Sequence, residues 1–172
     1  LAAGRLTEVK RFDLLIEQFA HIHEREPEWK LRILGEGEDR AKLEEQITKL
    51  GAGDYIMLTG RKNGDEVERE MLSASIFAMS SRSEGFPFVL MEAQSCGLPI
   101  IAYDVRVGPG AVVHDGEDGV LVPEGERRQY EDKLCELMDS PELREKMSAN
   151  ATAAIREFSE EKVAEKWYEV IE

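Results

Sequence analysis

Cysteine is nearly absent from this chain, because only Cys96 and Cys135 occur in 172 residues and neither belongs to a Cys-x-x-Cys pair. A disulfide framework and a cysteine-rich metal cluster are therefore excluded, and we expect a reducing, cytoplasmic location. The histidines supply no metal site either. His21 and His23 are two residues apart on an expected helix and point to different faces, and His114 stands alone in a turn. We expect neither a metal ion nor a cofactor.

Long apolar runs and a surplus of basic residues are also missing. No stretch approaches the roughly 18 apolar residues that span a bilayer, and the first residues lack the charged and apolar regions of a signal peptide. The chain has 22 Lys and Arg against 36 Asp and Glu, a formal charge of −14. This imbalance argues against a general nucleic-acid or anionic-membrane binder. Any phosphate ligand must therefore be held by a few local cations.

What the sequence does contain is an alternation of strand and helix signals, which predicts one α/β domain over residues 1–172 with a doubly wound, Rossmann-like parallel sheet. The length suits one such domain. Short apolar runs predict the strands, at Leu31–Leu34, Tyr55–Leu58, Ile76–Met79, Leu98–Ala102 and Val120–Val122, with Val112–Val113 as a further edge strand. Apolar residues at three- and four-residue steps predict the helices, at Val9–Arg25, Asp39–Leu50, Gly64–Ser73 and Pro87–Cys96, and a C-terminal helical tail of three segments from Arg127 that ends with Trp167 and Tyr168.

The segment G-R-L-T-E-V-K places two cations just after an expected strand. Gly4 frees the backbone to turn, Arg5 follows the strand end, and Lys10 falls in the first helical turn. Ligands of open α/β sheets bind outside the carboxyl ends of the strands. Arg5 and Lys10 are therefore candidates for a diphosphate clamp, with solvated surface charges as the alternative.

The string E-G-F-P-F-V-L-M-E is the most informative part of the chain, because it sets two carboxylates around a turn that opens a helix. We expect Pro87 at the first helical position, so that the N–H groups of Phe88 and Val89 are free to bind an anion. Glu84 can accept hydrogen bonds from sugar hydroxyls, and Glu92 from ribose hydroxyls. Two surface glutamates remain the alternative.

Two other enzyme classes fit these residues less well. Eight helical residues would separate the two carboxylates by about 12 Å, whereas glycosidases need about 5 Å or about 6.5–9.5 Å. Gly35-Glu36-Gly37 starts like a dinucleotide fingerprint, but Arg40 replaces the third glycine and acidic residues surround the turn. A dehydrogenase is therefore the weakest of the candidates.

Together, G-R-L-x-x-x-K, the Glu-x7-Glu string and the E-F-S-E-E of the tail resemble the C-terminal half of the retaining glycosyltransferases of family 4 (group 1), two-domain enzymes of the GT-B type. The resemblance covers nearly all of residues 4–172. It implies a donor-binding domain whose N-terminal partner domain is absent from this chain. The Asp-x-Asp metal ligands of the other large glycosyltransferase fold are missing, which fits metal independence.

The resemblance also assigns the residues. It implies that Glu84, Arg5 and Lys10 are catalytic. The donor-binding set it implies consists of Arg5, Lys10, Glu84, Gly85, Phe86, Phe88, Val89 and Glu92. Two positions depart from the commonest family pattern, since Pro87 replaces a glycine and Ala111 stands where a glutamate often follows the glycine-rich loop. We read the first as a variant that affects which sugar is accepted.

The function expected from the resemblance is hexose transfer from a nucleotide-diphosphate sugar to a glycan or lipid-linked acceptor, in polysaccharide or glycan assembly. A UDP-sugar is favoured and GDP-mannose is next. The expected partners are the nucleotide-sugar, the acceptor and the chain's own N-terminal domain, through which the protein could be membrane-peripheral. A non-catalytic nucleotide-sugar binding or sensor module is the alternative. By itself, this fragment is expected to be inactive.

Overall fold

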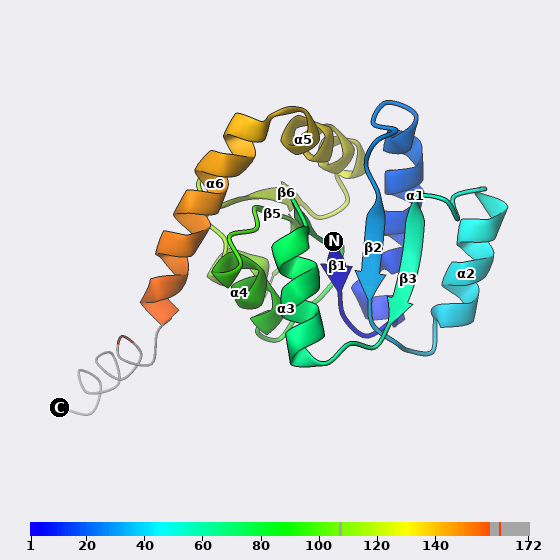
Figure 1. The fold of residues 1–172 in the computed structure, drawn as a ribbon, viewed down its shortest axis with the longest axis horizontal. Helices are drawn as coiled ribbons and strands as arrows, with labels where there is room; N and C mark the ends of the chain where they lie inside the picture. The colour runs from blue at the N-terminus through cyan, green and yellow to red at the C-terminus, as the bar shows by residue number, and fades with distance from the viewer. Residues whose placement is uncertain (107, 159–161, 163–172) are drawn as a thin grey trace.

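The computed structural model describes residues 1–106, 108–158 and 162, which form six strands and six α-helices (Figure 1). The strands are β1 (Ala2–Ala3), β2 (Leu31–Leu34), β3 (Ile56–Gly60), β4 (Phe77–Met79), β5 (Ile100–Asp104) and β6 (Gly119–Pro123). The helices are α1 (Phe12–His23), α2 (Arg40–Lys49), α3 (Gly64–Ser73), α4 (Phe88–Ser95), α5 (Arg127–Asp139) and α6 (Pro141–Ala154). Three short 3₁₀ turns complete the set: η1 (Glu8–Lys10), η2 (Pro109–Ala111) and η3 (Ile155–Phe158).

All the strand pairs are parallel and form two ladders, β1-β2-β3 and β4-β5-β6. A backbone hydrogen bond joins the ladders, because the N–H of Ala78 in β4 donates to the carbonyl of Leu1 beside β1, at 2.8 Å. The spatial order is therefore β3-β2-β1-β4-β5-β6. This is the doubly wound order, and its direction reverses between β1 and β4, the point where such sheets bind ligands. The predicted fold class is confirmed.

The sheet separates two apolar clusters, and the period-2 alternation of the strands supplies both. In β5, Ile101 and Tyr103 belong to the cluster that α1 and α5 cover. Ile100 and Ala102 belong to the cluster that α3 and α4 cover. In Figure 1, α3 lies in front of the sheet and α1 behind it. Strands buried on both faces explain why these segments read as continuous apolar runs.

Most predicted elements are present, with a difference at the first helix. The helix expected at Val9–Arg25 begins only at Phe12, because Arg11 adopts a left-handed conformation (φ 54°) that ends η1 and breaks the helical path. Val112 and Val113 are buried but lie in no strand. The tail segment with Trp167 and Tyr168 lies outside the described residues, as does most of E-F-S-E-E.

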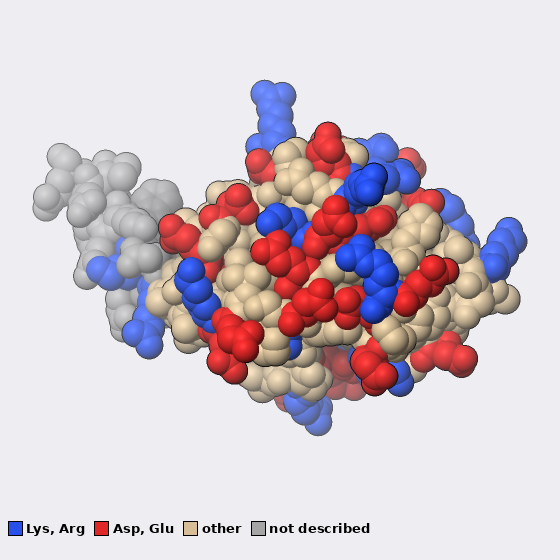
Figure 2. All heavy atoms as spheres, turned by 90° about the horizontal axis from the view of Figure 1, so that it is seen from above, with Lys and Arg blue, Asp and Glu red and all other residues tan. Residues whose placement is uncertain are grey.

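Charge is spread over the surface. Figure 2 shows acidic and basic side chains interspersed over one face of the molecule, with no single broad basic area on it. This distribution accords with the expectation that cations are collected only locally. Among the described residues, no helix is long and apolar enough to cross a membrane.

Candidate functional site

A cleft of about 530 Å³ opens at the carboxyl ends of β1, β2 and β3, beside the N-terminal half of α4. The residues that line it come from four separate segments of the chain: Ala3, Gly4, Arg5, Leu34, Gly35, Glu36, Gly37, Arg61, Lys62, Val67, Val89 and Glu92. Three predicted site residues, Arg5, Val89 and Glu92, are therefore brought together by the doubly wound fold, the first and last across 87 positions of sequence.

The floor of this cleft is built by the close approach of two backbone turns. The N–H of Gly4 donates to the carbonyl of Leu34 at 2.9 Å, and the N–H of Leu6 donates to the carbonyl of Glu36 at 2.9 Å. A Cβ on Gly35 would lie 1.8 Å from the carbonyl oxygen of Gly4, and one on Gly37 would lie 2.2 Å from that of Leu6. The Gly-Glu-Gly turn is therefore a packing device that lets the backbones touch.

Lys10 and Glu84 form an ion pair beside the cleft, with Lys10 Nζ 2.6 Å from Glu84 Oε1. Both side chains are mostly shielded, at 21% and 10% exposure. The Lys10 stem passes over Gly4, where an added Cβ would meet Lys10 Cε at 3.3 Å. Lys10 is therefore a shielded, paired cation rather than a solvated surface charge. Its ion pair links the G-R-L-x-x-x-K segment to the E-G-F-P turn.

Arg5 is placed differently. Its guanidinium lies 3.3 Å from the Glu38 carboxylate, and its side chain is 74% exposed. An ion pair as exposed as this contributes little, so the arginine is free to turn into the cleft toward an anionic ligand.

The start of α4 departs from the prediction. Pro87 is the residue before the helix (φ −84°, ψ 69°) and α4 begins at Phe88. The N–H of Phe88 donates to the carbonyl of Phe86 at 3.0 Å, so the expectation that it is a free donor is wrong in this structure. Val89 and Glu92 do line the cleft, one turn apart on the helix.

The aromatic residues of the turn point outward. Phe86 and Phe88 are 44% and 69% exposed and lie edge to face, with ring centroids 5.0 Å apart. Gly85 has open space around its α-carbon. The side of the turn away from the sheet is thus an exposed apolar edge.

Gly108, in the loop between β5 and η2, lies against Glu84. Gly108 has φ 136°, and a Cβ there would lie 2.8 Å from Glu84 Cβ. Only glycine fits this approach, so Gly108 packs closely against the Cβ end of the Glu84 side chain, whose carboxylate pairs with Lys10. Ala111 lies in η2, beyond this contact.

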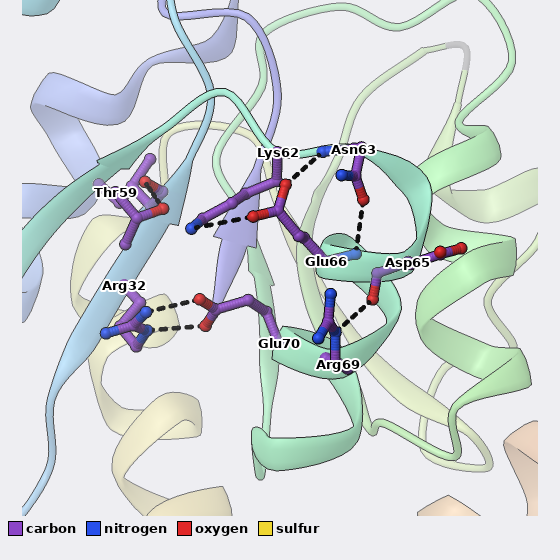
Figure 3. Close-up of polar contacts among 9 residues, drawn as sticks. Arg32, Thr59, Lys62, Asn63, Asp65, Glu66, Arg69 and Glu70 are labelled. Atoms are coloured by element: carbon purple, nitrogen blue, oxygen red, sulfur yellow. Dashed lines mark hydrogen bonds and ion pairs between the residues drawn. The ribbon is translucent and has the colours of Figure 1, made fainter.

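Sequence reasoning missed two cations in the cleft, Arg61 and Lys62. Both directly follow Gly60, the last residue of β3, so the rule that ligands bind at carboxyl ends of strands would have found them. Figure 3 shows Lys62 reaching toward Glu66 on α3, with Nζ 3.9 Å from Oε1. Arg61 forms no ion pair with the part of the chain that the structure describes.

The cleft lining therefore carries Arg5, Arg61 and Lys62 against two carboxylates, Glu36 and Glu92. Glu36 is itself paired with Arg40 at 2.6 Å. Arg5 and Lys62 have carboxylate partners beside the cleft, in Glu38 and Glu66. In a chain with a formal charge of −14, three cations nevertheless gather at the carboxyl ends of parallel strands, a position suited to phosphate.

A metal site is a separate question. Within residues 1–106, 108–158 and 162, no three His, Cys, Asp or Glu side chains are grouped so that they could hold a metal ion. His114 is engaged elsewhere, since its Nδ1 lies 2.8 Å from Asp118 Oδ2, and this hydrogen bond raises the pKa of the imidazole. Metal independence stays a prediction.

Comparison with known proteins gives consistent matches along the chain. The amylovoran biosynthesis glycosyltransferase AmsD of Erwinia amylovora is 32% identical over 171 residues, which cover 99% of this chain and 47% of AmsD. The UDP-N-acetylglucosamine–peptide N-acetylglucosaminyltransferase GtfA subunit of Streptococcus parasanguinis is 36% identical over 179 residues, covering all of this chain and 35% of that protein. The chain thus spans less than half the length of these relatives.

A solved structure agrees with these relatives in fold. The crystal structure of the pneumococcal O-GlcNAc transferase GtfA in complex with UDP and GlcNAc superposes with a TM-score of 0.88 at 30% identity, over 99% of this chain and 34% of that one. The family described as Glycosyl transferases group 1 matches residues 1–154, so the chain belongs to the group 1 glycosyltransferases.

Proposed function

We propose that this chain is the donor-binding half of a retaining glycosyltransferase that transfers a hexose from a UDP-sugar to a glycan or lipid-linked acceptor. The observation that carries the proposal is the cleft at the carboxyl ends of β1, β2 and β3, which Arg5, Arg61, Lys62 and Glu92 line together. Membership of the family supports glycosyl transfer, and the pneumococcal structure was solved with UDP and GlcNAc.

The positions of the cleft residues suggest which part of the donor each of them would bind. Glu92, exposed on α4 and one turn into the helix, would accept hydrogen bonds from the ribose hydroxyls. Arg5, Arg61 and Lys62 would neutralise the diphosphate, Arg5 as a bidentate donor. Val89 would pack beside the nucleotide.

The sugar would then lie toward Glu84 and Gly85, on the side of the E-G-F-P turn. Lys10 would share its charge between Glu84 and the departing diphosphate as the glycosidic bond breaks. Catalysis of this kind depends on position and on charges arranged in advance, which the Lys10–Glu84 ion pair and the cover of Gly108 provide. Arg5, Lys10 and Glu84 are therefore the groups proposed to act on the reacting end of the donor.

The proposal is tested by isothermal calorimetry of this chain with UDP, GDP and UMP in EDTA. We expect UDP to bind without metal and more tightly than UMP, because the second phosphate reaches the cations. Comparing the affinities of a panel of UDP-sugars would then identify the donor. If neither UDP nor GDP bound, the proposal would be wrong.

The other candidate function is that of a non-catalytic nucleotide-sugar binding or sensor module. A sensor would use the same cleft. Donor hydrolysis or transfer by the complete protein would distinguish the enzyme from the sensor.

A further inference from the structure

A second, smaller pocket of about 120 Å³ lies at the carboxyl ends of β4, β5 and β6 and shares no lining residue with the donor cleft. Three arginines line it, Arg11, Arg82 and Arg127, against one carboxylate, Glu124. Ligand pockets for molecules of nucleotide size are about 300–1,000 Å³. The pocket is therefore sized for one small anionic group.

The arginine at position 11 is unusual in its backbone. Among the described residues it is the only one other than glycine with a positive φ, at 54°. Glycine would adopt this left-handed conformation without strain. Residues with side chains that adopt it are concentrated at functional sites. The Arg11 side chain is 21% exposed, and its Nε lies 3.9 Å from Asp13 Oδ1, a long contact for an ion pair.

Backbone hydrogen bonds fix the positions of Arg82 and Arg127, and neither side chain forms a short ion pair with the described residues. The N–H of Arg82 donates to the carbonyl of Val9 at 2.9 Å, which sets it beside the turn that carries Arg11. The carbonyl of Arg127 accepts a hydrogen bond from Gln18 Nε2 at 3.0 Å. The Tyr103 hydroxyl in turn donates to Gln18 Oε1 at 3.2 Å. The Arg127 side chain makes only an exposed 3.5 Å contact with Glu17.

A serine also lines the pocket. Ser81 is 4% exposed and lines the pocket, and its side chain makes no hydrogen bond with the part of the chain that the structure describes. Its neighbour Ser80 donates instead to the carbonyl of Lys10 at 2.9 Å. A hydroxyl without a protein partner, in the same lining as three arginines, suits an oxyanion, which accepts a hydrogen bond from every donor present.

We propose that this pocket binds the phosphate group of a small soluble molecule, independently of the donor cleft. Guanidinium groups match phosphate oxygens in geometry as well as charge, and three of them line the pocket, two with only long contacts to carboxylates outside it. A phosphate on a membrane surface offers the same chemistry, but a chain with a formal charge of −14 is repelled by an anionic bilayer. The soluble phosphomonoester is therefore the occupant.

The test is a titration of the ¹⁵N-labelled chain with glycerol phosphate at constant ionic strength, followed by amide NMR. We expect saturable shifts at Ser81, Arg82 and Gly125. Arg82→Gln and Arg127→Gln should each weaken binding about tenfold or more, as loss of a charged hydrogen bond does. Arg128→Gln is the matched control, because this exposed neighbour on α5 does not line the pocket, and it should bind like the parent.

Arg11→Gly separates binding from folding. Glycine accepts the left-handed backbone, so this variant should keep its melting temperature while its affinity for glycerol phosphate falls. Equal affinity in the Arg82 and Arg127 variants, or the same shifts with acetate, would overturn the proposal. So would co-sedimentation with vesicles of phosphatidylcholine and phosphatidic acid when glycerol phosphate itself does not bind.

Discussion

Glu92 is the residue on which the proposed nucleotide site depends most directly, since it is an exposed carboxylate on the wall of the cleft. Glu92→Gln keeps the shape of the side chain but removes its charge. We expect the free energy of UDP binding to become less favourable by about 1.5–3 kcal/mol, the contribution of a hydrogen bond to a charged acceptor. Calorimetry checks this, with Glu68→Gln on the exposed face of α3 as the control. A Glu92→Gln chain that binds UDP like the parent would place the ribose elsewhere.

Lys10 and Glu84 are coupled partners rather than two independent ligands. Their 2.6 Å contact is largely shielded, so removing either charge leaves the other poorly solvated. We expect Lys10→Met and Glu84→Gln each to lower the free energy of unfolding by about 1–3 kcal/mol. The double variant should lose less than the sum, in urea denaturation of all four chains. Additive losses would mean that the pair does not exist in solution.

His114 gives the fold a small pH dependence. The hydrogen bond to Asp118 raises the pKa of His114 above its ordinary value of 6.5. A raised pKa means that the contribution is complete below pH 6.5 and is lost as the pH rises through the folded value. Stability of the parent should therefore fall in that window relative to His114→Gln, and denaturation between pH 5 and 9 measures it. Parallel profiles would contradict this.

At the scale of the element, α3 is fixed at its start by a reciprocal cap. Asn63 accepts from the N–H of Glu66 at 3.0 Å, and Glu66 accepts from the N–H of Asn63 at 3.0 Å, as Figure 3 shows. Asn63→Ala should cost about 1 kcal/mol of stability. Asn63→Asp keeps the cap and should stay near the parent in thermal unfolding. Since α3 follows Arg61 and Lys62, the alanine variant should also weaken UDP binding.

A second contact fixes α3 to the sheet. Arg32 of β2 forms a bidentate ion pair with Glu70 of α3, with hydrogen bonds of 2.6 and 2.8 Å. The hydrogen bond from Arg32 lowers the pKa of Glu70. Figure 3 shows the two side chains aligned across the gap between strand and helix. The helix that leads away from the donor cleft is thus held at both its start and its middle.

These elements show what local patterns can predict. The bounds of α3, Gly64–Ser73, are as predicted, because the break at Asn63-Gly64 and the apolar spacing are both local signals. The first helix was predicted too long, because apolar periodicity does not register a single left-handed residue such as Arg11. Pro87 was placed one position inside its helix for a similar reason, since a fixed φ suits the cap as well as the first turn.

The site was predictable only where chain order implies position. The cleft brings Arg5 and Glu92 together as the carboxyl-end rule requires. The Lys10–Glu84 contact joins residues 74 positions apart and has no local signal. Arg61 and Lys62 resemble ordinary solvated charges until β3 is known to end beside β2. Pairing and register, which depend on the whole core, therefore decided what the sequence left open.

At the scale of the whole molecule, the cleft is one wall of the catalytic space we propose. The chain covers 35% and 47% of the two enzymes compared, so most of each enzyme lies outside the matched region. We expect this chain to bind UDP and a UDP-sugar but to transfer no sugar, because acceptor positioning and exclusion of water need the opposite wall. The measurement is sugar transfer from UDP-sugars to oligosaccharide and lipid-linked acceptors, with a full-length relative as positive control. Calorimetry on the same preparation shows that the donor site is intact. Turnover by this chain at the rate of the full-length enzyme would mean that the cleft described here is a complete active site.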